Sequence, residues 1–454
     1  MKRPEFKLSE LTAISPIDGR YRSKVEKLAA WFSQYGLMRM RLKVEIEYLI
    51  KLLPRIGRKL TRKDEEELRG LWQNFSLKGA GRVKEFEQTA INDVKALEYY
   101  IRARLGTRHR KLVSFVHFGL TSDDVNVPAY GLALKEANET LIVPAIEELY
   151  GILRGFAKEQ KDLAMLGRTH GQPAVPTTLG KELANYVVRI EKILQQAHGF
   201  CFEAKLNGAV GNYNALVAAY PRVDWIRFSD RFISGLGLVP NRMTTQILPY
   251  DNWLQYFSLL KLLNNVLIGF CQDMWRYISD GYLLQIPVAG EVGSSTMPQK
   301  VNPIDFENAE GNLGIANALL EFYERKLPIN RLQRDLSDST VKRTFGAALA
   351  HSLLAYQNIV AGLGKIAPNK TKTSEELGDH WEVIAEGLQT ILRAEGIPDA
   401  YEKLSELTRG REVTQGALQE FIGSLKVSAA TKKKLMRMSP GNYVGLAEKL
   451  VSDI

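Results

Sequence analysis

The feature that most limits the possible folds of this chain is a set of long segments with apolar residues at helical spacing. They cover residues 25–53, 141–156, 179–202, 253–282 and 304–323, whereas alternating β-branched runs are few. As a helix, the segment 253–282 would extend about 45 Å at 1.5 Å per residue. Such helices, apolar on more than one face, cannot hide that surface within one subunit. We therefore predict an all-α fold whose central long-helix bundle also packs against other chains.

The chain has 454 residues, which is too long for one compact core. Candidate boundaries lie at the basic stretch from Arg108 to Lys111 and near Pro368. We predict an N-terminal helical domain (1–111), a central long-helix bundle domain that carries the catalytic loop (112–366) and a C-terminal helical domain (367–454). No internal repeat is evident.

Charge and cysteine content limit the function classes. The net charge of +10 could indicate nucleic-acid binding. However, the basic residues are interspersed with acidic ones, which favours solvated helix faces and a small anionic substrate. Cys201 and Cys271 lack CxxC spacing, and the six His are scattered singly. We therefore expect no disulfide and no metal site. The start of the chain leads into no apolar signal segment, and polar residues interrupt the apolar run 263–274, so we expect a cytoplasmic protein that binds neither nucleic acid nor membrane.

The loop from Gly290 to Pro303 is not explained by packing. It combines flexible glycines with hydroxyls, an amide and the cation of Lys300. Backbone N–H groups and a lysine can trap an anion, and the same donors can stabilise a serine alkoxide. Read alone, the Gly-Ser-Ser turn is more often an ordinary helix entry than a catalytic loop.

The eleven-residue string Gly293-Ser-Ser-Thr-Met-Pro-Gln-Lys-Val-Asn-Pro303 resembles the signature loop of the fumarase/aspartase superfamily, whose members eliminate fumarate from a substituted succinate. With its extension to Asn308 it is most similar to the adenylosuccinate lyase family, bacterial type, although Gln299 stands where many members have His. The resemblance implies Ser294 as general base, with Lys300 and Asn302 stabilising the carboxylate that develops. Ser295, a neighbouring substrate contact, is chemically identical and stays an alternative base.

A second segment, Leu166 to Pro176, contains the best general-acid candidate, His170. It resembles the family motif RTHGQPATP and differs from it at Val175. The resemblance implies that Glu307 orients His170 for proton transfer and that Thr169 and Gln172 contact the substrate.

Other segments resemble the family's nucleotide-binding residues. Each also has a simpler interpretation as a turn, a helix cap or a solvated helix start. Asn92 stands where relatives usually have His and cannot carry a proton at neutral pH. Asp123 is expected to help cap the following helix, and His117 is expected to be a core histidine. The remaining implied substrate contacts are Arg20, Tyr21, Asn92, Asp93, Thr121, Ser122, Gln246, Arg334, Ser339 and Arg343.

Together these likenesses predict a carbon–nitrogen lyase of the amidine-lyase type in purine nucleotide biosynthesis, working without a cofactor as a homotetramer with active sites shared among subunits. It would release fumarate from adenylosuccinate, giving AMP, and from succinylaminoimidazole carboxamide ribotide. One alternative is a sister enzyme acting on aspartate, argininosuccinate or fumarate, but those substrates lack the phosphate that Arg20 and Arg334 would bind. The other is an inactive helical scaffold or a basic nucleic-acid-binding protein.

Overall fold

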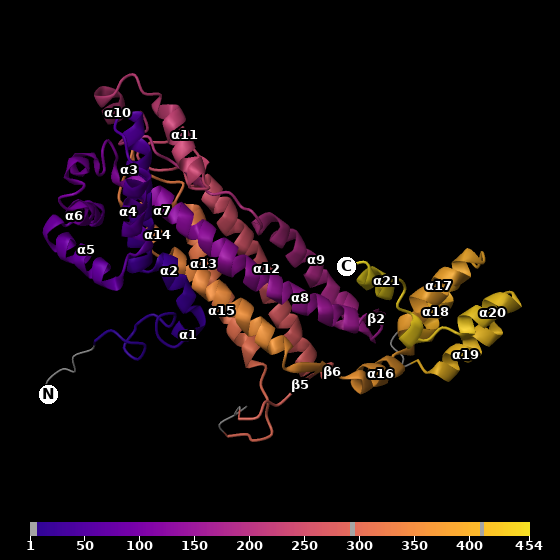
Figure 1. The fold of residues 1–454 in the computed structure, drawn as a ribbon. Coiled ribbons are helices and arrows are strands. Elements are labelled where there is room, and N and C mark those ends of the chain that lie inside the picture. The colour runs from indigo at the N-terminus through magenta and orange to yellow at the C-terminus, as the bar shows by residue number, and fades with distance from the viewer. Residues whose placement is uncertain (1–6, 291–295, 409–412) are drawn as a thin grey trace. The chain divides into compact units, whose positions relative to one another are not determined.

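The computed structural model describes residues 7–290, 296–408 and 413–454. In these ranges helices dominate and strands form three two-stranded sheets (Figure 1), which confirms the predicted all-α class. The α-helices are α1 (Arg22–Val25), α2 (Ala29–Phe32), α3 (Gln34–Arg55), α4 (Arg62–Gln73), α5 (Leu77–Ala90), α6 (Asp93–Leu105), α7 (Ser122–Ala137), α8 (Val143–Glu159), α9 (Leu179–Ala197), α10 (Asn214–Ala219), α11 (Trp225–Gly235), α12 (Asp251–Ser279), α13 (Ile304–Lys326), α14 (Ser337–Lys342), α15 (Phe345–Leu363), α16 (Lys370–Gly378), α17 (Ala385–Ala394), α18 (Ala400–Thr408), α19 (Gln415–Ser424), α20 (Ala429–Met436) and α21 (Ala447–Ser452). Short 3₁₀ or π turns are η1 (Glu26–Leu28), η2 (Arg110–Phe115), η3 (Asn138–Ile142), η4 (Trp381–Ile384) and η5 (Pro440–Asn442). The strands are β1 (Ala164–Thr169), β2 (Gln172–Thr178), β3 (Glu203–Ala204), β4 (Val239–Pro240), β5 (Leu283–Gln285) and β6 (Ile366–Pro368).

The chain forms two compact units, which we describe separately. Unit 1 comprises Met1–Ala145, Ile193–Asn265 and Gly311–Ala355, and unit 2 comprises Ile146–Lys192, Val266–Glu310 and Tyr356–Ile454. The unit boundaries fall within α8, α9, α12, α13 and α15. The three sequence domains with boundaries at 111 and 366 stay a prediction.

Four of the five predicted long helices are confirmed as α8, α9, α12 and α13. The fifth, predicted as one helix over 25–53, is wrong in its first part. Ser33 is extended, with φ −75° and ψ 167°, and its side chain accepts a hydrogen bond from the Gly36 N–H at 3.0 Å. Because the first N–H groups of a helix need outside acceptors, Ser33 ends α2 and begins α3.

The N-terminal part of unit 1 has its own core between α3, α4, α5 and α6. Leu42, Ile46, Leu49 and Leu53 recur along one face of α3 and are buried in one cluster with Leu97 of α6. This spacing keeps one stripe of the helix facing its neighbours. Figure 1 shows these helices together in the indigo and purple part of the chain.

Helix α7 is surrounded by protein in unit 1. All residues from Asp123 to Leu134 are buried. Charged side chains are rarely buried without a partner of opposite charge, since a lone buried charge generally costs several kcal/mol. Asp123 and Asp124, in the first turn of α7, should therefore have cations as neighbours. Several predicted substrate contacts lie around this end of the helix.

In unit 2, β1 and β2 form an antiparallel hairpin. Its register shifts between Leu166 and Arg168, at a bulge occupied by Gly167. A Cβ at Gly167 would lie 2.4 Å from the carbonyl oxygen of Val175, so only glycine fits there. Leu166 belongs to the same buried cluster as Leu388 and Ile422, so the hairpin is anchored on the core of the C-terminal helices α16 to α20.

Helix α12 is long and apolar enough to cross a membrane by length and composition, yet 56% of its most apolar 18 residues is buried within the structure. A core helix of a globular protein meets the same criterion, and we interpret α12 as one. Cys201 is exposed and Cys271 is buried, and both are free thiols in this structure.

Candidate active site

The predicted site residues fall into both units. Ser294 and Ser295 lie outside the described residues. Unit 2 contains Thr169, His170, Gln172, Lys300, Asn302 and Glu307. Unit 1 contains Arg20, Tyr21, Asn92, Asp93, Thr121, Ser122, Gln246, Arg334, Ser339 and Arg343.

His170 lies at the tip of the β1–β2 hairpin. The strands pair up to Thr169 and Gln172, which leaves His170 and Gly171 as a two-residue loop. Both loop residues have positive φ, 54° and 74°, as a type I′ turn requires. Among residues with a side chain, Asn, Asp and His adopt this conformation most readily. The turn exposes His170, so its imidazole is presented by a rigid hairpin and is available to a ligand or to a neighbouring chain.

Glu307, the predicted partner of His170, lies in the first turn of α13. Its Oε1 accepts a hydrogen bond from Trp275 Nε1 at 3.1 Å. Within the described part of this single chain no hydrogen bond joins Glu307 to His170, so their pairing stays a prediction. Lys300 is exposed and Asn302 half-buried in the segment just before α13.

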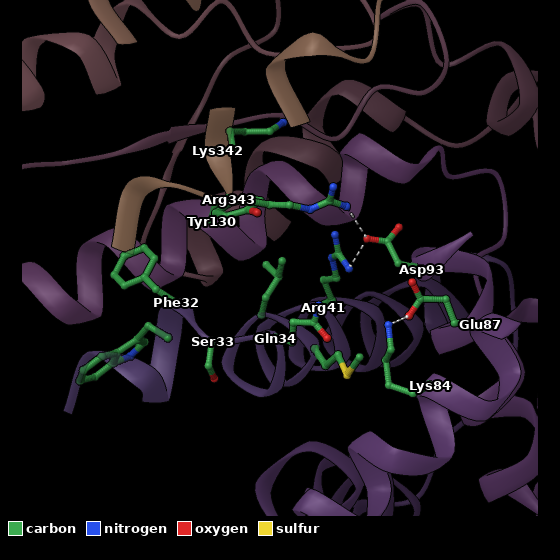
Figure 2. A pocket seen from close by; sticks show the side chains of 13 residues that line it. Phe32, Ser33, Gln34, Arg41, Lys84, Glu87, Asp93, Tyr130, Lys342 and Arg343 are labelled. Atoms are coloured by element: carbon green, nitrogen blue, oxygen red, sulfur yellow. Dashed lines mark hydrogen bonds and ion pairs between the residues drawn. The ribbon is translucent and has the colours of Figure 1, made fainter. Parts of the chain in front are cut away.

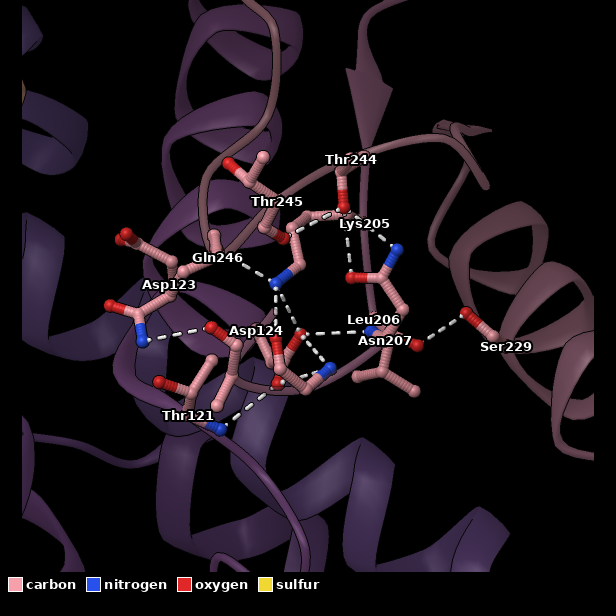
Figure 3. A network of polar contacts seen from close by, with 12 residues as sticks. Thr121, Asp123, Asp124, Lys205, Leu206, Asn207, Ser229, Thr244, Thr245 and Gln246 are labelled. Carbon is pink, nitrogen blue, oxygen red and sulfur yellow. Dashed lines mark hydrogen bonds and ion pairs between the residues drawn. The ribbon is translucent and has the colours of Figure 1, made fainter. Parts of the chain in front are cut away.

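The start of α7 is held by a buried ion pair. Lys205 Nζ lies 3.0 Å from Asp124 Oδ1, and both side chains are fully buried. Asp124 accepts hydrogen bonds from the N–H groups of Thr121 (2.9 Å), Asn207 (3.0 Å) and Gly208. Lys205 also donates to the carbonyl oxygens of Gly208 and Gln246 (Figure 3). This one pair therefore fixes Thr121 and the main chain of Gln246, both predicted substrate contacts.

The neighbouring aspartate, Asp123, has a different role from the predicted one. Asp124, three residues after Thr121, accepts the Thr121 N–H and so completes the helix start. Asp123 instead turns toward cations: its Oδ2 lies 2.7 Å from the Arg334 guanidinium, and its Oδ1 lies 3.7 Å from Lys342 Nζ. The expectation that Asp123 caps α7 is wrong, because its carboxylate faces the half-buried Arg334 and the buried Lys342.

Arg334 joins two other predicted substrate residues. Its Nη1 donates to Gln246 Oε1 at 3.0 Å, and its Nη2 donates to Ser339 Oγ at 3.3 Å. The Gln246 amide also donates to the Ala209 carbonyl oxygen at 3.1 Å. Gln246, Arg334 and Ser339 thus form one hydrogen-bonded group, although Gln246 lies 88 residues before Arg334 in the sequence.

Behind this group lies a second buried charge pair. Lys342 Nζ donates to Asp338 Oδ2 and to the Tyr250 hydroxyl, each at 2.7 Å, and that hydroxyl donates to Asp338. Burial opposes ionisation of Asp338, but Lys342 and Tyr250 outweigh it, so the pKa of the Asp338 carboxyl lies below its usual value. The pair ties α14 to the start of α12 and so sets the position of Ser339.

Asn92 and Asp93 begin α6. Asn92 Oδ1 accepts from the Lys95 N–H at 2.8 Å, so the simpler interpretation of Asn92 as a helix cap agrees with the structure. Asp93 lines a pocket of about 460 Å³ in unit 1, together with Arg41, Tyr130 and Arg343 (Figure 2). Burial opposes ionisation of Asp93, but Arg41 and then Arg343 outweigh it and lower its pKa.

The Ser15–Tyr21 turn lies beside a smaller pocket of about 190 Å³. Its lining includes Ser15, Asp18, Arg22 and Arg343. Arg20 is exposed and Tyr21 half-buried at the start of α1. Arg343 lines this pocket and the one that contains Asp93, whereas Arg20 and Tyr21 line neither.

Sequence reasoning missed the charges beneath these residues: Arg41, Asp124, Lys205, Asp338 and Lys342. The sequence hardly marks these residues, because a charged residue is assumed to be exposed unless a partner of opposite charge is known. His117, expected as a core histidine, is half-buried, and its Nδ1 lies 2.5 Å from Oε1 of the buried Glu45.

One group among the described residues has the composition of a metal site. Single ligand atoms of Asp64, Glu67 and His109 lie within 4.8 Å of one another. Thr61 already hydrogen-bonds to Asp64, and the Arg108 guanidinium lies 2.6 Å from Glu67. These contacts account for the cluster as ion pairs, and we assign no metal to it.

Two family models match most of the chain. Residues 19–317 match a family described as lyase, and residues 330–444 match the adenylosuccinate lyase C-terminal family. Among similar proteins, the adenylosuccinate lyase of Legionella pneumophila (strain Corby) is 46% identical over 98% of this chain and 99% of its own. The adenylosuccinate lyase of Escherichia coli (strain K12) is 43% identical over 99% of this chain and 100% of its own.

Solved structures share the fold. A fumarate lyase from Mesorhizobium sp. BNC1 superposes with a TM-score of 0.77 at 16% identity, over 94% of this chain and 97% of its own. The 3-carboxy-cis,cis-muconate lactonizing enzyme from Pseudomonas putida gives 0.78 at 19% identity, over 95% and 97%. The sequence matches go further than this fold likeness, and with them the predicted resemblance is confirmed: the chain belongs to the adenylosuccinate lyase family and is a lyase.

Proposed function

We propose that this chain eliminates fumarate from adenylosuccinate, giving AMP, and from succinylaminoimidazole carboxamide ribotide, giving the carboxamide ribotide. The observation that carries the proposal is the match to adenylosuccinate lyases, at 46% identity over almost the full length of both chains. The hydrogen-bonded group of Gln246, Arg334 and Ser339 supports it. Such a group offers amide, cation and hydroxyl donors to a phosphorylated substrate.

The elimination needs two proton carriers. A base removes the proton from the carbon beside a carboxylate, the electron pair forms the double bond of fumarate, and the carbon–nitrogen bond breaks. The nitrogen leaves only if an acid protonates it. We assign Ser294 as the base and His170, oriented by Glu307, as the acid. The exposed position of His170 at a constrained turn supports this role.

Lys300 and Asn302 are assigned to the substrate carboxylate. Deprotonation beside a carboxylate builds a second negative charge, which a cation and an amide stabilise mainly in the transition state. Ser295, Thr169 and Gln172 are assigned as substrate contacts, together with Arg20, Tyr21, Thr121, Ser122 and Asn92.

The assembly is a homotetramer in this proposal, with each active site completed by several subunits, and its location is the cytoplasm. Exposed apolar side chains on the long helices support burial against other chains: Leu262 of α12, and Ile315 and Phe322 of α13, are all more than two-fifths exposed.

The assignment of the base is tested by two matched variants. Ser294→Ala should bind substrate and lose nearly all turnover, while Ser295→Ala keeps measurable activity in a fumarate-release assay. The reverse pattern would move the base by one residue. Near-normal turnover in both variants would reject a serine base in this loop.

A further inference from the structure

Arg41 is a buried cation that no sequence motif identifies. It lies on α3 with 6% of its side chain exposed, and its Nη1 lies 2.9 Å from Asp93 Oδ2. Among the described residues its Nε is buried without a hydrogen-bond partner. An arginine kept in such a place is held by its one carboxylate, so the Arg41–Asp93 pair is a fixed part of the pocket wall.

Arg343 approaches the same carboxylate oxygen from the other side. Its Nη2 lies 3.5 Å from Asp93 Oδ2, and 61% of its side chain is exposed (Figure 2). An exposed pair at this distance is weak. Asp93 itself is steadied by a second contact, since its Oδ1 accepts from the Val94 N–H at 2.9 Å. The two guanidiniums therefore differ: the buried Arg41 is bound firmly to Asp93, whereas the exposed Arg343 contacts it only weakly.

The position of Arg343 suggests a role for its weak contact with Asp93. Arg343 lines the pocket of Asp93 and also the smaller pocket beside Ser15 and Arg22. A guanidinium held weakly at such a point can turn to a phosphate without losing a strong partner. A carboxylate without a second cation would compete with that phosphate for Arg343, since its charge would be uncompensated.

We propose that Arg41 is a positioning residue: by binding Asp93 it compensates that carboxylate, so that Asp93 orients Arg343 toward the phosphate of a nucleoside monophosphate without retaining it. This inference rests on the proposed function for the identity of the ligand. It assigns Arg41 no contact with the substrate. Arg41 acts on phosphate binding only indirectly, through Asp93 and Arg343.

The test is a double-mutant cycle on ligand binding by the full-length protein, measured by isothermal titration calorimetry with AMP and with adenosine, which lacks the phosphate. Arg41→Met should weaken AMP binding on the order of tenfold, the scale of one charge-assisted contact, and leave adenosine binding within about twofold. In the Asp93→Asn background the same change should have little effect on AMP, because the carboxylate that retains Arg343 is gone. Arg41→Lys, which keeps the charge, should restore most of the AMP affinity.

Lys51→Met is the matched control, since Lys51 is an exposed cation on the same helix, and it should change neither affinity. Arg41→Gln takes the place of Arg41→Met in the cycle if the latter does not fold. Equal losses for AMP and adenosine, or the same AMP loss with Asn at position 93, would overturn the proposal and leave the lyase function standing. A wild-type protein that binds no AMP would overturn this inference, whereas the lyase function is decided separately by fumarate release.

Discussion

Lys205 and Asp124 form a fully buried ion pair, with 3.0 Å between Nζ and Oδ1. The ammonium also contacts the carbonyl oxygens of Gly208 and Gln246, while the carboxylate accepts from three main-chain N–H groups. Each charge is therefore surrounded by partners, and the pair connects the start of α7 to the loop that carries Gln246. Removing one member leaves the other charged and buried.

Lys205→Met should destabilise the protein by about 3–5 kcal/mol, the usual cost of leaving one charge of a buried pair uncompensated. Adding Asp124→Asn should recover part of that loss, because the second charge is removed as well. Denaturant unfolding followed by circular dichroism measures both. Lys78→Met, at an exposed position on α5, is the control and should change stability by less than about 0.5 kcal/mol. A double variant as unstable as the sum of its parts would contradict the interpretation.

His170→Asn separates the turn from the chemistry. Asn followed by Gly is the preferred sequence of a type I′ turn, so the variant should fold with unchanged or raised thermal stability. Turnover should fall about 10² to 10⁴-fold, since an amide cannot carry the proton. Steady-state fumarate release and a thermal melt on the same sample measure the two effects. Loss of activity together with loss of folding would show instead that His170 serves the hairpin.

The pair of His117 and Glu45 predicts a pH-dependent stability. Burial opposes charging of His117, but Glu45 outweighs it, so the pKa of the imidazole is raised in the folded state. Glu98 and Asp124 act in the same direction. The stabilisation is complete below the unfolded pKa of about 6.5 and is lost as pH rises through the higher folded value. His117→Asn, chosen because His117 has φ 58°, should thus be more destabilising at pH 6 than at pH 9. A difference that does not change with pH would contradict this.

Shared active sites predict complementation. Mixing inactive His170→Asn protein with inactive Ser294→Ala protein should restore part of the fumarate release, because some hybrid sites then draw both wild-type residues from different subunits. Subunit exchange is checked by native mass spectrometry of the same mixture. Exchange without recovered activity would mean that each site takes both residues from one chain.

The sequence predicts the helices better than it predicts the contacts that hold the candidate site together. The periodicity of α12 and α13 is local and readable, and Arg334, Gln246 and His170 lie in recognisable strings. The pairing of Lys205 with Asp124 is different, because it joins distant segments and neither residue is marked by its neighbours. Arg41 occupies a position that an apolar residue would also fit, and the break at Ser33 depends on one capping hydrogen bond. The hairpin below His170 is short, so its alternation is too brief to stand out among helices.

The central claim is tested most directly by following fumarate release spectrophotometrically with a panel of substrates. The wild-type protein should turn over adenylosuccinate without an added cofactor. It should not turn over argininosuccinate, aspartate or malate, because these compounds lack the phosphate that Arg334 and Arg343 would bind. Turnover of one of those three compounds with none of adenylosuccinate would contradict the central claim.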